Sequence, residues 1–211
     1  MPFIVKIENL RYWERMARPT LKNERREQIL DAFETCVARY GVEGATLAKT
    51  AEEAGLARPL VRHNVGNRDE LLAALVDRYL KNSQAKMAET FAALPVENAS
   101  DVLIDWLFDP LYTDAKLVQV ASALISASND NPELATKMRR WVDEFVSSLN
   151  DQLAMDFPAA DPAQVAAVAA GVSGIYFNVE ALYPLGDITA LAASSKRAAL
   201  TLLKSLETHD G

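Results

Sequence analysis

The stretch that decides the fold is Thr46–Leu72, TLAKTAEEAGLARPLVRHNVGNRDELL, because it contains two short helical segments separated by one turn. Residues 47–54 are mostly good helix formers and are followed by Gly55, a residue that commonly ends a helix. Pro59 stands where a second helix begins, since proline fits the first turn of a helix, and Gly66 ends it. The stretch therefore predicts two short helices joined by a tight glycine turn.

The second of these helices has the composition of a DNA-recognition helix. Residues 56–66 contain two arginines and a histidine and no acidic residue. A short helix with one polar side fits the major groove of DNA, and two such helices packed under a preceding one form a helix-turn-helix. We expect the side chains of Leu60 and Val61 to point inward from this second helix and to be buried. The candidate DNA-contacting residues on this helix are Arg58, Arg62, His63 and Asn64.

Two further candidates lie in the first short helix. Thr46 stands at the helix start, where its hydroxyl and the neighbouring backbone N–H groups can meet a phosphate. Lys49 follows one turn later as a second candidate for phosphate contact. The alternative for all these side chains is that they are only solvated surface residues.

The helices on either side of this motif are indicated by apolar residues at helical spacing. Upstream, Gly41 is expected to end a helix whose buried face is Ile29, Phe33, Cys36, Val37 and Tyr40. Downstream, Asn67 and Glu70 have the spacing of a capping box. They predict the start of a long helix with a buried face of Leu71, Leu72, Leu75, Val76, Tyr79 and Leu80.

The rest of the chain is punctuated by capping residues and prolines that predict further helices. No segment alternates polar and apolar residues for long, and no hairpin turn separates two β-branched runs. The chain is therefore predicted to be all-α. The helix starts indicated are Ser100 (through Phe108), about residue 115, Pro132, Asp161–Pro162 and Asp187.

Composition limits the class of protein. The chain has 211 residues, half of them hydrophobic, which is enough for a real core. A single cysteine excludes a disulfide framework, no Cys/His spacing suggests a metal site, and no secretory signal precedes the helices, so a cytoplasmic protein is expected. Residues 162–179 carry no charge, but they are mostly alanine and predict a buried helix with a small-residue face rather than a membrane span.

The charge is unevenly distributed along the chain. The net charge is −7, yet residues 1–81 carry +2 and the remainder carries −9. Such a division suggests an N-terminal part that faces a polyanion and a C-terminal part that does not. The alternative is that the difference reflects solvation alone.

The motifs resemble those of the TetR family of bacterial transcriptional regulators. The similarity covers about residues 23–81, through Tyr40–Gly41, Ala45–Leu47, Ala51–Leu56 and Asn67–Leu72, in the order and spacing of that family. The alanine-rich helix and the leucine-bearing last helix are similar to the family's dimerisation pair. The chain departs from the family pattern in the recognition helix and just after it, at Arg62, Asn64, Val65 and Arg68.

The resemblance implies a division into an N-terminal arm (1–22), a three-helix DNA-binding domain with a helix-turn-helix (23–82), and a larger helical ligand-binding and dimerisation domain (83–211). It implies a homodimer that binds a pseudo-palindromic operator on double-stranded DNA and is released by a small-molecule effector, with repression as the family default. Arg68 stands where the family contacts phosphate, so it joins the candidate DNA-contacting residues.

Candidates for the effector pocket and the dimer interface come from the C-terminal part. Aromatic side chains with one amide could line a ligand pocket, although aromatics at helical spacing are often ordinary core. Small residues on the alanine-rich helix allow close approach of a second helix, from a partner or from the chain itself. The pocket candidates are Trp106, Tyr112, Trp141, Phe145, Tyr176 and Asn178. The interface candidates are Ala167, Ala170, Gly171, Gly174, Ala198 and Leu202.

Two other classes of protein compete with this interpretation. An enzyme is disfavoured because the chain has only His63 and His209, with no glycine-rich phosphate loop and no metal or cofactor motif. The second alternative is an all-helical interaction protein that has the same fold but does not bind an operator, because function depends on the site and not on the fold.

Overall fold

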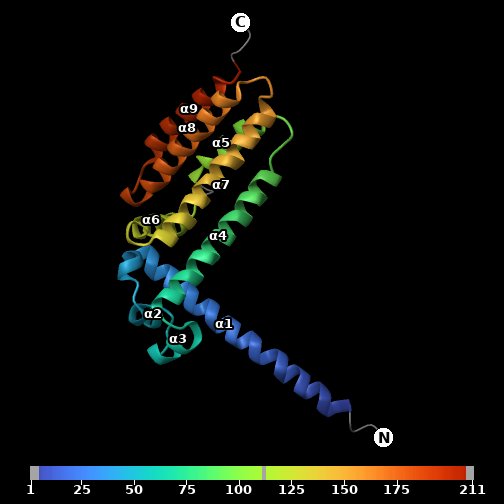
Figure 1. Ribbon diagram of the computed structural model, residues 1–211, viewed down its shortest axis with the longest axis vertical. Helices are drawn as coiled ribbons and strands as arrows, with labels where there is room; N and C mark the ends of the chain where they lie inside the picture. Colours follow the sequence, from blue (N-terminus) through green and yellow to red (C-terminus); the bar gives the residue numbers. More distant parts are fainter. Residues whose placement is uncertain (1–4, 111–112, 208–211) are drawn as a thin grey trace. The chain divides into compact units, whose positions relative to one another are not determined.

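The computed structural model describes residues 5–110 and 113–207, and every regular element within them is helical, as the sequence predicts (Figure 1). The chain divides into two compact units, Met1–Arg78 and Tyr79–Gly211, and the boundary falls inside one long helix, α4. The predicted boundary between residues 82 and 83 lies four residues further along the same helix.

The first unit contains α1 (Val5–Gly44), α2 (Leu47–Glu53), α3 (Arg58–Val65) and the start of α4 (Arg68–Ala92). Both α2 and α3 pack against α1 and against each other, which is the predicted helix-turn-helix arrangement. The residues that α1 was predicted to bury do form the core, with one exception. The fully buried large side chains of this unit are Ile29, Phe33, Val37, Val61, Leu71 and Leu75.

The exception is Tyr40, which is 44% exposed although it was predicted to be buried. Its position follows from the next residue, because Gly41 has φ +69° and breaks the helical path at this point. The helix then resumes and ends at Gly44, so Gly41 interrupts α1 where the sequence predicted an end. Tyr40 is therefore the last residue before a kink and no longer follows the apolar stripe.

The second unit contains the rest of α4 with α5 (Ala99–Leu107), α6 (Ala115–Ala127), α7 (Pro132–Asp156), α8 (Pro162–Ala181) and α9 (Thr189–Lys204). Short 3-10 turns, Ser128–Asp130 and Tyr183–Leu185, connect the longer helices. In this unit α8 packs between α7 and α9, and α5 packs against α7 and α9 (Figure 1). The core is built from leucine and valine side chains of these helices, among them Leu103, Leu149, Leu153, Val172 and Leu203.

Local capping explains why three of these helices begin where the sequence predicts. The side chains of Asp114, Asn131 and Asp161 each accept a hydrogen bond from a backbone N–H in the first turn of α6, α7 and α8, respectively. These bonds satisfy N–H groups that have no partner within the helix.

The start of α5 differs from the prediction. Asn98, in the left-handed conformation with φ 57°, precedes the helix, and Ser100 is buried in its first turn and is not the cap. The backbone N–H and the hydroxyl of Ser100 donate to Oδ2 of Asp156 on α7, at 2.8 and 2.5 Å. The capping acceptor is thus supplied from 56 residues away, which local sequence does not reveal.

Helix α8 has two different faces. The segment Pro162–Leu185 is long and apolar enough to cross a membrane by length and composition, and 33% of it is buried within the chain. Its valines at 165, 168, 172 and 179 point into the core of the unit. The opposite side carries the predicted small residues, including Ala166, Ala167, Ala170 and Gly174, but they are exposed, so α8 is not the buried helix that the sequence predicts.

Candidate nucleic-acid interface

The outer side of α3 is basic. Arg58, Arg62 and His63 are all exposed, and the only fully buried side chain of the helix is Val61, which attaches it to the core. Between Leu56 and Arg68 the sequence contains no acidic residue, so nothing on this segment cancels the positive charge. A cationic helix surface of this kind can approach phosphates and the edges of bases.

Leu60 does not lie where the sequence predicts. It was expected to be buried with Val61, but its side chain is 39% exposed. The reason is the position of Leu60 on α3: successive residues of a helix are about 100° apart, so Leu60 is turned away from the face on which Val61 is buried. Leu60 is therefore part of the outer surface, together with the basic residues.

Asn64 is half-buried, and its amide is already engaged. Its Nδ2 donates to the backbone O of Leu60 at 2.8 Å, one turn earlier in α3. This bond fixes the side chain along the helix, which leaves Oδ1 as the acceptor available to a partner such as a base or a water molecule.

Thr46 and Lys49 belong to the start of α2. Thr46 is exposed, and its Oγ1 accepts a hydrogen bond from the backbone N of Lys49 at 3.3 Å, so it caps the helix as predicted. The ammonium of Lys49 lies 4.0 Å from the centre of the Tyr40 ring, within the range of a cation–π interaction. Tyr40 thereby fixes the position of one cation on the surface of this unit.

Arg68 has a structural role that the sequence did not suggest. Its Nη2 donates to the backbone O of Val42 at 2.5 Å, and its Nε donates to the backbone O of Ala45 at 3.3 Å. The carbonyl of Val42 belongs to the last turn of α1 and that of Ala45 to the connection that follows, at a helix end where carbonyl groups lack regular helical partners. Arg68 therefore ties the start of α4 to this turn, and most of its guanidinium is engaged within the unit.

The connection from α3 to α4 is the predicted capping box. The backbone N of Asn67 donates to Glu70 Oε2 at 2.7 Å, and the backbone N of Glu70 donates to Asn67 Oδ1 at 2.9 Å. Gly66, with φ +78°, makes this closure possible: a Cβ at this position would lie 1.9 Å from Glu70 Oε2. The end of α3 and the start of α4 are thus fixed by Gly66 and by the two hydrogen bonds between Asn67 and Glu70.

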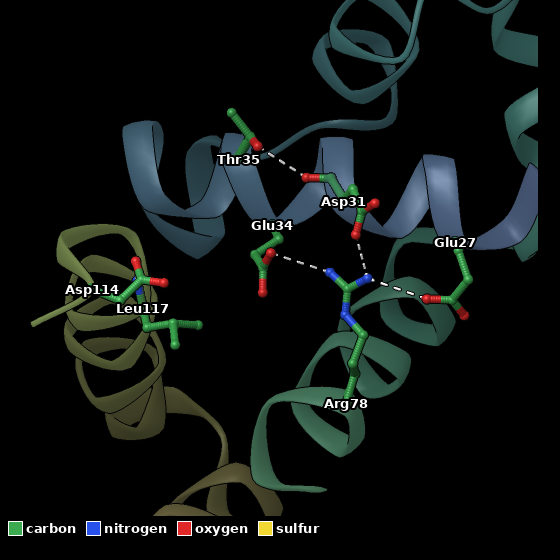
Figure 2. Close-up of polar contacts among 7 residues, drawn as sticks. All are labelled: Glu27, Asp31, Glu34, Thr35, Arg78, Asp114 and Leu117. Atoms are coloured by element: carbon green, nitrogen blue, oxygen red, sulfur yellow. Dashed lines mark hydrogen bonds and ion pairs between the residues drawn. The ribbon is translucent and has the colours of Figure 1, made fainter. Parts of the chain in front are cut away.

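A buried arginine holds α4 against α1, and Figure 2 shows its guanidinium between three carboxylates of α1. Arg78 Nη1 lies 2.6 Å from Asp31 Oδ1 and 3.3 Å from Glu27 Oε2, and Nη2 lies 3.3 Å from Glu34 Oε2. The side chain of Arg78 is only 16% exposed. Sequence interpretation missed this cluster, although Glu27, Asp31 and Glu34 have the spacing of one helix face.

In the second unit, several of the predicted pocket residues do come together. Phe145 stacks on Tyr176 with ring centres 5.4 Å apart, and Phe177 lies 5.6 Å from Trp141 and 5.1 Å from Phe145. Tyr79 joins the cluster from α4, 5.7 Å from Trp141. We call these five rings the aromatic cluster.

The other predicted pocket residues lie elsewhere. Trp106 is half-buried on α5, and Tyr112 lies outside the described residues. Asn178 is exposed and lines a groove between α8 and α9, so the structure does not bring it to the aromatic cluster.

A carboxylate beside the aromatic cluster was not predicted. Glu180 is half-buried, and its Oε1 accepts a hydrogen bond from Thr113 Oγ1 at 3.1 Å. Burial raises the pKa of Glu180 above its usual range, and burial together with the charge of Glu180 raises the pKa of Tyr79 and of Tyr176. A signal was present in the sequence, because Glu180 is the first acid after the uncharged run 162–179.

The predicted interface residues divide into two groups. Ala167, Ala170, Gly174 and Ala198 are exposed, and the last two line the groove between α8 and α9. Gly171 and Leu202 are half-buried instead, because a Cβ at Gly171 would lie 3.0 Å from Leu202 Cδ1. That pair serves the packing of α8 on α9 within the chain.

Comparison with known proteins agrees with this arrangement. No protein-family model matches the chain. The chain is 27% identical over 185 residues to the HTH-type transcriptional regulator BetI of Paraburkholderia phytofirmans, a match that covers 87% of this chain and 92% of that protein. It is 34% identical over 89 residues to the HTH-type transcriptional repressor AcnR of Corynebacterium jeikeium, covering 39% of this chain and 45% of that protein. Among solved structures, a TetR-family regulator from Cytophaga hutchinsonii superposes with a TM-score of 0.69 at 14% identity, covering 87% of this chain and 95% of that one.

The helix-turn-helix, its basic outer surface and these relatives define the class of the protein, a DNA-binding transcriptional regulator. The chain has the fold of the TetR family, so the resemblance seen in its sequence is confirmed.

Proposed function

We propose that the chain is a ligand-responsive repressor that binds a pseudo-palindromic operator as a homodimer. The observation that carries the proposal is the outer side of α3, where three basic side chains are exposed over a single buried anchor and the sequence has no acid between Leu56 and Arg68. A protein that kept the fold but no longer bound DNA would have no need of an uninterrupted cationic surface on this helix.

Some of the exposed cations contact phosphates in this proposal, and others contact base edges. Arg58 stands in the first turn of α3, and the first residues of a recognition helix meet the base edges in the major groove. Arg62 and His63 lie one turn later, where phosphate contact fixes the register of the helix on DNA. Thr46, Lys49 and Asn64 add contacts at the edge of this surface. Arg68 acts indirectly, because it positions the turn between α1 and α2.

The exposed small-residue face of α8 and α9 supports the dimer. A helix without charge over residues 162–179 and with much of its apolar surface outside the core is unusual for a monomer, and such patches mark association sites. A two-fold axis through this face brings the same residues of two copies together. Two recognition helices related by that axis require an operator with two similar, inverted half-sites.

The second unit is the proposed site of the effector. The aromatic cluster supplies the apolar lining of a ligand pocket, and Glu180 with Thr113 supplies polar anchors beside it. The effector lowers operator affinity by favouring a conformation of the dimer that does not fit both half-sites. The largest possible loss of operator affinity is set by how much more tightly the effector binds that conformation than the operator-binding one. The site of action is the cytoplasm, where the chromosome is accessible, and the proposed role involves no catalysis.

The experiment that tests the DNA-binding role is a fluorescence anisotropy titration with DNA from upstream of the protein's own gene. We expect tight binding that requires the inverted repeat and weakens steeply with salt, in proportion to the phosphates contacted. Arg62→Ala is expected to weaken binding by about 30-fold or more, since each charged contact is worth roughly 1–3 kcal/mol and is made twice in a dimer.

The matched control is Arg139→Ala, which removes an exposed arginine from α7 in the second unit. It changes the net charge by the same amount and is expected to leave affinity nearly unchanged. Equal affinity for scrambled DNA, or an equal loss in the two variants, would contradict operator recognition through α3. In that case the chain would be an interaction protein with this fold.

A further inference from the structure

Leu60 is the one large apolar side chain on the outer surface of α3. It is 39% exposed, and its neighbours on that surface are cationic or polar. Successive residues of a helix are separated by a rotation of about 100°, so Leu60 is turned away from the buried Val61 and lies about 60° from His63. Its position on the helix therefore belongs to the surface that would face DNA.

Leu60 is not buried within the unit, since 39% of it is exposed. The amide of the neighbouring Asn64 is turned to the backbone, because its Nδ2 donates to the backbone O of Leu60 at 2.8 Å. Leu60 is the third residue of α3, within its first turn. In helix-turn-helix proteins the first residues of the second helix are those that reach the base edges.

The major groove offers a single apolar feature, the C5-methyl group of thymine, while the other groups exposed there are hydrogen-bond donors and acceptors. We infer that Leu60 contacts the methyl group of a thymine in each half-site of the operator and so determines part of the sequence preference. This contact rests on the proposed function, because it requires that α3 enter the major groove. It adds an apolar contribution to the polar contacts assigned to Arg58, Arg62 and His63.

The experiment uses deoxyuridine, which differs from thymidine only by the missing methyl group. A duplex that binds the full-length protein is first selected from a randomised DNA pool. Each thymine is then replaced by deoxyuridine at the equivalent position of both half-sites, and the dissociation constant is measured for the unmodified protein, Leu60→Ala and Leu60→Met.

For one thymine position, we expect the replacement to weaken binding by the unmodified protein about fourfold per methyl group, or about 15-fold for both half-sites. Leu60→Ala should bind the thymine and deoxyuridine duplexes equally, whereas Leu60→Met keeps an apolar side chain and should still discriminate between them. Leu185→Ala removes an exposed leucine of the second unit and serves as the matched control, with discrimination unchanged.

The outcomes separate this inference from the function on which it depends. If the protein selects a specific duplex but no thymine position responds to deoxyuridine, or Leu60→Ala responds as the unmodified protein does, the leucine contact is wrong and the proposed regulator remains. If no duplex is bound better than scrambled DNA, the proposed function fails and the leucine contact fails with it.

Discussion

Glu180 is a carboxylate whose charge is disfavoured by its surroundings. Burial raises its pKa, and the side chains facing it are Thr113, the phenols Tyr79 and Tyr176, and the ammonium of Lys86, which acts in the opposite direction. A pKa that is higher in the folded than in the unfolded chain means that the folded chain holds more protons between the two values. Stability therefore falls as the pH rises through this interval, which begins near the ordinary value of 4.5.

We expect Glu180→Gln to raise the melting temperature at pH 7.5, by on the order of a few degrees, and to have little effect at pH 4. The amide keeps an acceptor for Thr113 but carries no charge to desolvate. Thermal denaturation at a series of pH values measures the difference, with Glu97→Gln as a control at an exposed carboxylate. A variant that melts below the unmodified protein at pH 7.5 would show that ionised Glu180 is stabilising, contrary to this assignment.

Arg62 and Arg68 show how residue type alone fails to assign a role. Both are arginines in or beside the recognition helix, yet Arg62 is exposed whereas Arg68 donates to backbone carbonyl groups of Val42 and Ala45. The two carbonyls lie more than 20 positions earlier in the sequence. The difference between an exposed candidate for DNA contact and a structural tie is therefore set by the packing of α4 on the end of α1.

Helix α4 depends on a polar contact with α1 as well as on its apolar face. Arg78 is the shared cation for Glu27, Asp31 and Glu34, so its removal takes away the positive charge that all three carboxylates face. We expect Arg78→Met to lower the free energy of unfolding by about 1–3 kcal/mol, measured by urea denaturation at pH 7. The estimate is moderate because Glu27 and Asp31 are largely exposed.

Two further variants make this prediction specific. Adding Glu34→Gln to Arg78→Met should restore part of the lost stability, because it removes the most buried of the three carboxylate charges. Arg140→Met breaks an exposed pair with Glu144 on α7 and should change stability by less than about 0.5 kcal/mol. Equal losses for the two arginine variants would mean that the cluster around Arg78 is only a surface pair.

The helices that could be predicted from sequence are those whose ends are determined locally. Thr46 caps α2, Asn67 and Glu70 close on each other, and Asp161 caps α8, each with partners within three residues. The predictions that failed depend on distant partners or on which side of a helix faces the core. Ser100 meets Asp156 across 56 positions, and Leu60 is exposed because it is turned about 100° away from Val61, the fully buried side chain of α3.

In the candidate site, too, the features set by local sequence could be predicted, and those that depend on distant residues could not. The basic residues of α3 were identified from an uninterrupted stretch without acids, which is a local property. The aromatic cluster was predicted in part, because helical spacing indicates which rings share a face but not whether they meet rings of another helix. Asn178 was predicted to join the rings as a polar residue of the pocket, yet it lines the groove between α8 and α9.

In the assembled protein, the outward face of α8 is the surface on which the proposed dimer depends. Gly174 lies in the middle of it, is exposed, and has nothing within 4 Å of the position that a Cβ would occupy. A larger residue is therefore accommodated in the separate chain, and glycine is the weaker helix former, so Gly174→Arg should not destabilise the monomer. Across a two-fold axis, however, two arginines would meet in a tightly packed, uncharged surface.

We therefore expect Gly174→Arg to shift the protein from about twice 23.2 kDa to 23.2 kDa in light scattering after gel filtration. Its affinity for the full palindrome should fall by about 100-fold or more, since linked binding sites gain roughly that much from a high effective concentration. Binding to a single half-site should be unchanged, because α3 is not altered. Ala154→Arg, at an exposed position of α7, controls for the added charge and should remain dimeric. A Gly174→Arg protein that keeps the mass of a dimer would place the interface on another face, while loss of half-site binding would mean that the substitution had disturbed the fold.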